Sequence, residues 1–190
     1  MIHPVRLDEN HRYWSGDRRV PGYSEIVKDL GVAPENKFYT DAGREEGIAL
    51  HQWLHFLASG RTATSEPDPR IAGRVAGIEK FIRDTGFKFI GGEEPQYDPV
   101  VGFACTPDAW GTIGTWTWCL DAKRGAKLPT HSLQTAAQVL ALARNGFRAQ
   151  KRGALYLRDE DYRLVEHTDA SDRGNWIVLV QAWKIKQEYK

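Results

Sequence analysis

Apolar side chains recur along this chain at helical spacing in three segments. A helix turns once in 3.6 residues, so apolar positions three or four apart share one face. In residues 67–85 they are Ile71, Val75, Ile78 and Ile82. In residues 131–146 they are Leu133, Ala137, Leu140 and Ala141, and in residues 171–188 they are Trp176, Leu179, Val180 and Trp183. We predict a core-packed helix in each segment.

A further helix is predicted from Thr40 or Asp41, both favourable N-cap residues, to about Ser59. Within it, Gly47 and His51 are four residues apart and therefore lie one turn apart on the same face. The small residue permits close approach of a neighbouring backbone, and the imidazole can serve as a metal ligand. A lone helical histidine is more often structural or solvent-exposed.

Strand-like segments lie between and around these helices. They occur at residues 5–20, 87–91, 102–125 and 153–167, separated by turn-forming residues. Strands interleaved with helices predict an α/β (α+β) fold with a mixed central sheet flanked by helices. We interpret residues 1–190 as one domain, with a strand-rich N-terminal arm to about residue 39 and a C-terminal helix at about 171–188.

The segment 102–125 reads as a β-hairpin with charged residues at one end. Alternation along its second arm places Asp121 and Lys123 on one face and apolar side chains on the other. Asp108, on the preceding arm, returns to the same neighbourhood. Two carboxylates and a lysine at one sheet edge can bind Mg²⁺ and leave the lysine beside the attacking water. The alternative is an ion pair on a half-exposed strand, which contributes little to stability.

Composition limits the partners and cofactors. The 190 residues carry a formal net charge of +1, so any nucleic-acid surface must be a local patch. No apolar stretch has the length of a transmembrane span and the N-terminus lacks a signal-peptide core, so we expect a cytoplasmic protein with no membrane partner. Cys105 and Cys119 lie on adjacent arms of the proposed hairpin, and we expect them to be reduced. Two cysteines cannot supply the four thiolates of an iron–sulfur cluster.

The hairpin residues resemble the motif of a known nuclease superfamily. Pro107-Asp108 followed by Asp121-Ala122-Lys123 resembles the core motif of the PD-(D/E)XK nucleases, specifically their RecB-type and phage-exonuclease branch. The resemblance covers roughly residues 40–160. It implies a restriction-endonuclease-like αβββαβ core.

Two helical motifs of the same branch have counterparts here. Gly47 and His51 resemble the GxxxH motif, and Gln134 resembles the glutamine of the QxxxY motif. The chain departs from the second pattern, because Gln138 stands where the tyrosine is expected. The departure puts an aromatic contact to DNA at this position in doubt, though it leaves the metal site unaffected.

The resemblance implies metal-dependent hydrolysis of phosphodiester bonds. Asp108 and Asp121 would hold one or two Mg²⁺ or Mn²⁺ ions, with the backbone carbonyl of Ala122 and the imidazole of His51 completing the ligand set. Lys123 would orient or deprotonate the attacking water and offset charge in the transition state.

Further site residues follow from the same resemblance. Gln134 would orient groups beside the nucleophile or a DNA phosphate. In relatives an acidic residue before the hairpin often approaches the active site, so Glu94, in preference to Glu93, is a candidate ligand or base. The simpler alternative is a solvated pair of carboxylates beside a turn.

Basic residues follow the hairpin and the next helix. A candidate nucleic-acid surface comprises Arg124, Lys127, Arg144, Arg148, Lys151 and Arg152. Beside a phosphodiesterase site such a run can contact phosphates. A charge run is otherwise a solvated face, and the sequence does not decide between the two.

The function that the resemblance implies is a metal-dependent DNA exonuclease of recombination, repair or phage DNA processing, in a bacterium or a phage-infected host. DNA is the implied partner, and a single-strand annealing or recombination protein is a candidate second one. A structure-specific or restriction-like endonuclease and a non-catalytic nucleic-acid-binding module on the same fold are the alternatives. Oligomeric state, number of metals, polarity and strand preference stay open.

Overall fold

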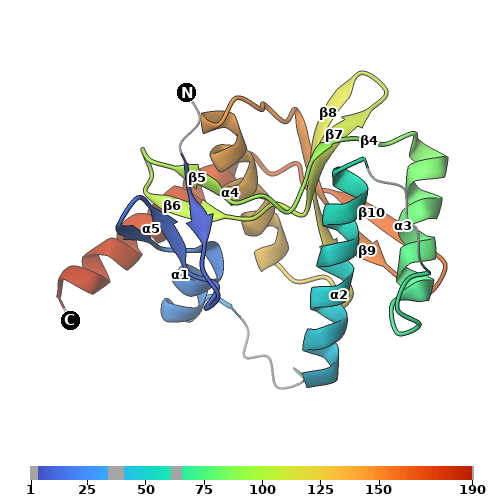
Figure 1. Cartoon of the computed structure of the whole chain (residues 1–190). Coiled ribbons are helices and arrows are strands. Elements are labelled where there is room, and N and C mark those ends of the chain that lie inside the picture. Colours follow the sequence, from blue (N-terminus) through green and yellow to red (C-terminus); the bar gives the residue numbers. More distant parts are fainter. Residues whose placement is uncertain (1–3, 34–40, 61–65, 190) are drawn as a thin grey trace.

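A mixed five-stranded sheet forms the centre of the molecule (Figure 1). The computed structural model describes residues 4–33, 41–60 and 66–189. The sheet has the strand order β10-β9-β8-β7-β4. Its strands are β4 (Lys88–Gly91), β7 (Ala109–Ile113), β8 (Trp116–Lys123), β9 (Lys151–Leu157) and β10 (Tyr162–Glu166). β8 and β9 are parallel and the other neighbours are antiparallel, which makes the sheet mixed, as predicted.

Helices cover both faces of the sheet (Figure 1). They are α2 (Asp41–Ala58), α3 (Ala72–Thr85), α4 (Thr130–Arg144) and α5 (Ser171–Glu188). α2 and α3 pack on one face and α4 on the other, and α5 packs against α4. The order α3-β4-β7-β8-α4-β9 is the predicted αβββαβ core, with the parallel β8 and β9 joined through α4.

The start of α3 differs from the prediction. The helix begins at Ala72, several residues after the Pro67 that the apolar pattern suggested. Asp68 accounts for the difference, because its carboxylate accepts a hydrogen bond from the backbone N–H of Arg70 at 2.9 Å and closes a turn before the helix.

The predicted hairpin 102–125 is divided between two sheets. Its first residues form β6 (Phe103–Cys105), which pairs with β5 (Gln96–Asp98), and only β7 and β8 form the hairpin. The prediction that Cys105 lies on an arm adjacent to Cys119 was therefore wrong. Both cysteines are buried and free.

The N-terminal arm packs beside the smaller sheet. β1 (Arg6–Leu7), β2 (Tyr13–Ser15) and β3 (Arg18–Val20) form an antiparallel sheet, and α1 (Tyr23–Asp29) follows. A bridge between Gly22 and Ala104 joins this arm to β6. The described ranges contain no helix that is long and apolar enough to cross a membrane.

Separate cores fix the two faces of the sheet. On one face, Leu50 and Leu54 of α2 pack with Phe81 of α3 and with Leu120 of β8. On the other side of the molecule, Trp176 of α5 is fully buried among residues of α1, β6 and α4. The helices that carry site residues, α2 and α4, are thus held against opposite faces of β8.

Candidate metal centre and its lysine network

The alternation predicted for β8 determines which side chains reach the site. Leu120 packs into the core beneath α2 and α3. Asp121 and Lys123 point the other way, toward α4. Asp121 has no exposed surface, so its charge must be compensated within the protein.

Three side chains compensate that carboxylate. Lys123 Nζ forms an ion pair with Asp121 Oδ2. Gln134 Nε2 donates to Asp121 Oδ1 at 2.8 Å, and Gln138 Nε2 donates to the same oxygen at 2.7 Å. Lys123 Nζ also donates to Gln134 Oε1 at 2.9 Å. The structure thereby joins Asp121, Lys123 and Gln134, three of the residues that the sequence proposed for one site.

The charge of Lys123 is set by two opposing effects. Burial favours the neutral amine, but the carboxylates of Asp121 and Asp108 outweigh it and raise the pKa of Lys123 above its ordinary value. The lysine is consequently a cationic hydrogen-bond donor at neutral pH.

Gln138 contacts this network, which the sequence did not predict. It occupies the position where the motif has tyrosine, and its side chain is almost fully buried against Asp121. Cys119 Sγ donates to its Oε1 at 3.7 Å, which fixes which end of the amide faces the carboxylate. The signal available in the sequence was its spacing, one helical turn after Gln134.

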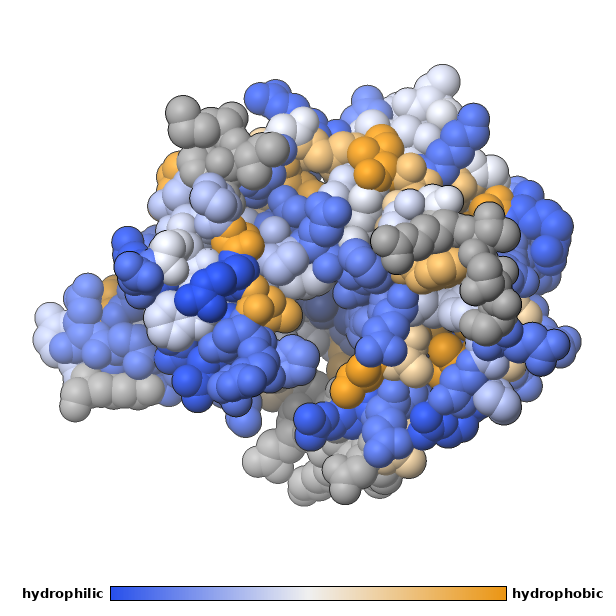
Figure 2. All heavy atoms as spheres, in the orientation of Figure 1, coloured by the Kyte–Doolittle hydropathy of each residue, from blue (hydrophilic) through white to orange (hydrophobic). Residues whose placement is uncertain are grey.

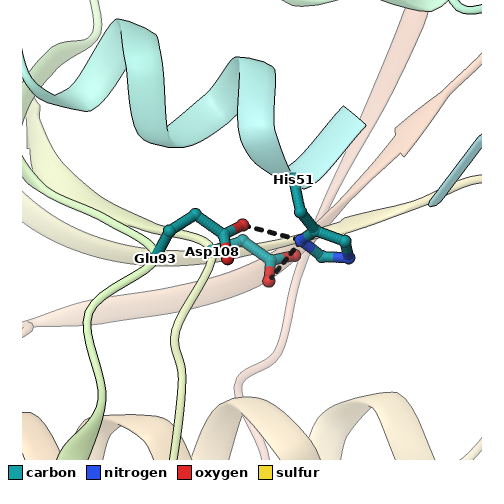
Figure 3. Close-up of side chains that lie close together, drawn as sticks. All are labelled: His51, Glu93 and Asp108. Carbon is teal, nitrogen blue, oxygen red and sulfur yellow. Dashed lines mark hydrogen bonds and ion pairs between the residues drawn. The ribbon is translucent and has the colours of Figure 1, made fainter. Parts of the chain in front are cut away.

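A second cluster, next to this network, has the donors for a metal ion. His51, Glu93 and Asp108 place one ligand atom each within 4.8 Å of one another, and Figure 3 shows the three side chains converging. His51 Nδ1 lies 2.6 Å from Glu93 Oε1 and 3.5 Å from Asp108 Oδ1. Carboxylate oxygens with one imidazole nitrogen suit Mg²⁺ or Mn²⁺, and the nitrogen favours Mn²⁺ somewhat.

Glu93, and not Glu94, belongs to this cluster. Glu94, which the sequence preferred, is exposed and is outside the group. Gly92 explains the local geometry, because a Cβ there would lie 2.5 Å from the backbone oxygen of Asp108. Glu93 itself has φ of 56° and its N–H donates to Pro107 at 2.8 Å. The glycine pair before Glu93 was the available signal for this close approach.

The pKa values of His51 and Asp108 in the cluster are both shifted upward. Asp108 raises the pKa of His51 to about 9, against an opposing effect of burial, and Glu93 adds to the increase. Burial and the charge of Asp121 raise the pKa of Asp108, which His51 partly offsets. A proton on His51 thus compensates the two carboxylates, and a metal ion would replace that proton.

A hydrogen bond from the residue after Asp121, Ala122, links Asp108 to β8. The two aspartates nevertheless do not belong to the same ligand group. The Ala122 N–H donates to Asp108 Oδ2 at 2.6 Å. Asp121 is not a member of the metal-ligand group in the described part of the chain, because its oxygens face Lys123 and α4. Ligation by Asp121 and by the Ala122 carbonyl stays a prediction.

The glycine of the GxxxH pattern makes room for a side chain. A Cβ on Gly47 would lie 3.3 Å from the guanidinium of Arg124, so a side chain approaches here and not the neighbouring backbone that the sequence suggested. Arg124 Nη1 donates to Glu46 at 3.1 Å and Nη2 donates to the Gly43 carbonyl. Arg124 therefore ties the hairpin exit to α2.

One predicted phosphate contact is a buried structural residue. Arg152, predicted on the nucleic-acid surface, is 6 % exposed and pairs with Asp172 at 2.7 Å, so its guanidinium is directed into the protein. Of the other candidates, Lys127 and Arg148 are exposed. Arg144 Nε lies 3.5 Å from Asp98 Oδ2, and Lys151 Nζ forms an ion pair with Glu166 Oε2 at 3.1 Å.

The cluster opens into a cleft of about 700 Å³. One wall is the N-terminal arm, including Arg12 and Tyr13, and the other is α2, including Gln52 and His55. Figure 2 shows the surface hollowed between these parts of the molecule. Gln134 and Gln138 line the same cleft, so it reaches both the metal-ligand group and the lysine network.

Comparisons with known proteins give similarity of structure only. No family model and no curated protein matches the chain. The alkaline exonuclease LHK-Exo from Laribacter hongkongensis is 15% identical, with 86% of this chain and 87% of that chain aligned and a TM-score of 0.43. LHK-Exo in complex with dAMP is 16% identical, with 90% and 88% aligned and a TM-score of 0.47. A protein from Eubacterium rectale, provisionally named an exonuclease, is 9% identical, with 87% and 72% aligned and a TM-score of 0.49.

Proposed function

We propose that this protein is a metal-dependent deoxyribonuclease that hydrolyses phosphodiester bonds, and that it acts as an exonuclease. The observation that supports it is the meeting of a His51–Glu93–Asp108 ligand group with the Asp121–Lys123 pair at the end of one hairpin. An ordinary surface ion pair needs neither the buried second carboxylate nor the cleft.

Mg²⁺ or Mn²⁺ is the proposed cofactor. When bound, the cation would supply Lewis-acid activation of the phosphodiester and of the attacking water. His51, Glu93 and Asp108 would hold it, and we retain Asp121 and the Ala122 carbonyl as further ligands. Binding requires His51 to lose the proton that it keeps in the metal-free protein.

Lys123 would act as a fixed cation beside the reacting phosphate. Its raised pKa favours hydrogen-bond donation and charge stabilisation over removal of a proton from water. Gln134 would hold the amine through its Oε1 while its Nε2 orients Asp121. Gln138 would be a positioning residue that acts through Asp121.

DNA is the proposed substrate, and recombination, repair or phage DNA processing is the proposed setting. A single-strand annealing or recombination protein is the second partner to test. The cleft between the N-terminal arm and α2 offers a route for a nucleic-acid strand to the ligand group.

The test is digestion of end-labelled linear DNA and closed circular DNA with Mg²⁺, Mn²⁺ or EDTA. We expect metal-dependent loss of the linear substrate alone, abolished in Asp121→Ala and Lys123→Ala variants that remain folded. Cleavage of the circle would identify an endonuclease instead. DNA binding without cleavage under every metal would refute catalysis and favour a binding module.

A further inference from the structure

A basic pocket lies at the hairpin exit and shares no lining residue with the cleft. Its volume is about 180 Å³. It is formed by the loop after β8 and by the ends of β9 and β10. The charged and polar side chains that line it are Arg124, Lys127, Tyr156, Arg158 and Arg163.

The pocket has an excess of positive charge. Arg124 pairs with Glu46, whose carboxylate also pairs with Arg74. Lys127, Arg158 and Arg163 are exposed and form no ion pair among residues 4–33, 41–60 and 66–189. No acidic residue lines the pocket. Asp161, which follows in the adjoining turn, pairs with Lys80 at 3.2 Å.

Strand register connects this pocket to the catalytic lysine. Lys123 of β8 is opposite Tyr156 of β9, and Tyr156 is opposite Arg163 of β10. Register partners point to the same face, so the three side chains form a row on the α4 side of the sheet. Adjacent strands are about 4.8 Å apart, which puts Arg163 roughly 10 Å from Lys123 along the row.

We propose that this pocket binds a backbone phosphate of the nucleic acid that is not the one cleaved. The inference rests on the proposed function, because it takes the reacting phosphate to lie at Lys123. The charges of one DNA strand are spaced about 3.4 Å apart along the duplex axis, so the phosphate concerned lies at most about three nucleotides from the reacting one. The pocket is smaller than the pockets of about 300–1,000 Å³ that hold whole small-molecule ligands, which suits a phosphate group. Arg158 and Arg163 are the contacts that the sequence did not identify.

The experiment is DNA binding in EDTA, where no cleavage occurs, measured by fluorescence anisotropy on a labelled 20-mer duplex between 50 and 200 mM NaCl. The variant is Arg158→Gln/Arg163→Gln in the full chain. Arg83→Gln/Arg173→Gln is the matched control, because it removes the same charge from exposed positions on α3 and α5. Urea unfolding of all three proteins checks that they are equally folded.

For the pocket variant we expect a Kd at least about tenfold higher at 100 mM salt, and a salt slope about 0.9 lower, because one phosphate contact is lost. The control pair should keep the wild-type slope. An equal loss in both pairs, or an unchanged slope in the pocket variant, would overturn the inference. So would binding of inorganic phosphate that depends on Arg158 and Arg163 while DNA binding does not, since that defines a free-anion site.

The outcome is separable from the proposed function. If the wild-type protein cleaves DNA but the pocket variant binds normally, the phosphate pocket is refuted and the nuclease stands. If binding depends on Arg158 and Arg163 but the wild-type protein cleaves nothing, the pocket stands and catalysis is refuted.

Discussion

Replacement of Arg152 by methionine should destabilise the protein strongly and leave its intrinsic affinity for DNA unchanged. Arg152 Nη1 donates to the Ser132 carbonyl at 2.7 Å and to Thr135 Oγ1 at 3.0 Å. Nη2 donates to Asp172 Oδ2 and to the Asp169 carbonyl, each at 2.7 Å. The guanidinium thereby joins β9 to α4 and to the start of α5.

The magnitude follows from what the substitution leaves behind. Asp172 is 6 % exposed. Without Arg152, its carboxylate keeps a hydrogen bond from Ser132 Oγ at 3.3 Å. Removal of one partner of a buried ion pair costs about 3–5 kcal/mol, because the other charge stays buried without compensation. Methionine keeps most of the side-chain volume, so the loss of packing adds little. The total stability of a domain is about 5–15 kcal/mol, so the effect is large.

The assay is urea unfolding, with a double-mutant cycle. We expect Arg152→Met to lower the free energy of unfolding by about 3–5 kcal/mol. Arg152→Met/Asp172→Leu should recover a substantial part, because no buried charge is left unpaired. Arg148→Met is the matched control, an exposed arginine on the same approach to β9, and should change stability by no more than about 0.5 kcal/mol.

Two patterns of results would refute this reasoning. If Arg152 contacted phosphate instead, Arg152→Met would leave the urea midpoint unchanged and lower the salt slope of DNA binding by about 0.9. A double variant that is as unstable as the sum of the two single ones would likewise show that Arg152 and Asp172 are not coupled.

Three further predictions concern the site and its surroundings. Glu93→Gln should weaken Mn²⁺ binding in calorimetry at least about tenfold, whereas Glu94→Gln should not; equal effects would contradict the cluster. Gln138→Leu should lower the free energy of unfolding by about 1.5–3 kcal/mol, since Asp121 loses a charge-assisted hydrogen bond, and an unchanged urea midpoint would exclude that bond. Burial lowers the pKa of His131 to about 4, so the folded protein keeps this imidazole neutral while the unfolded chain protonates it near pH 6.5. The free energy of unfolding is therefore unaffected by this group above pH 6.5 and falls as the pH drops from 6.5 toward 4. His131→Asn should therefore lose less stability between pH 7 and 4.5 than the wild type, by about 1–2 kcal/mol after allowance for solvent screening, in urea unfolding at both pH values; parallel losses would argue against it.

Periodicity predicted the elements of the fold because it depends on local geometry alone. The helix predicted at residues 171–188 is present as α5. The alternation predicted for β8 is present in the two faces of that strand. Errors arose where pairing between distant segments decided the outcome. Phe103–Cys105 is compatible with the β7–β8 hairpin by pattern, but it finds its partner in β5.

The basic residues illustrate a second limit of sequence reasoning. Arg148 and Arg152 belong to one charge run, yet one is exposed and the other is buried. What separates them is Asp172, which follows Arg152 by 20 positions and reaches it only because α5 packs on α4. A run of like charges therefore identifies no surface until the positions of its counter-charges are known.

The departure from the motif at Gln138 has a physical explanation in the network around Asp121. A buried carboxylate needs donors, and Asp121 Oδ1 receives one from Gln134 and a second from Gln138. An amide at this position can donate to the carboxylate and accept from Cys119 at the same time. The residue that breaks the sequence pattern thus contributes to restraining Asp121, while Lys123 balances its charge. The spacing of one helical turn placed both glutamines on the same face, but only the packing of α4 across β8 gave them a common acceptor.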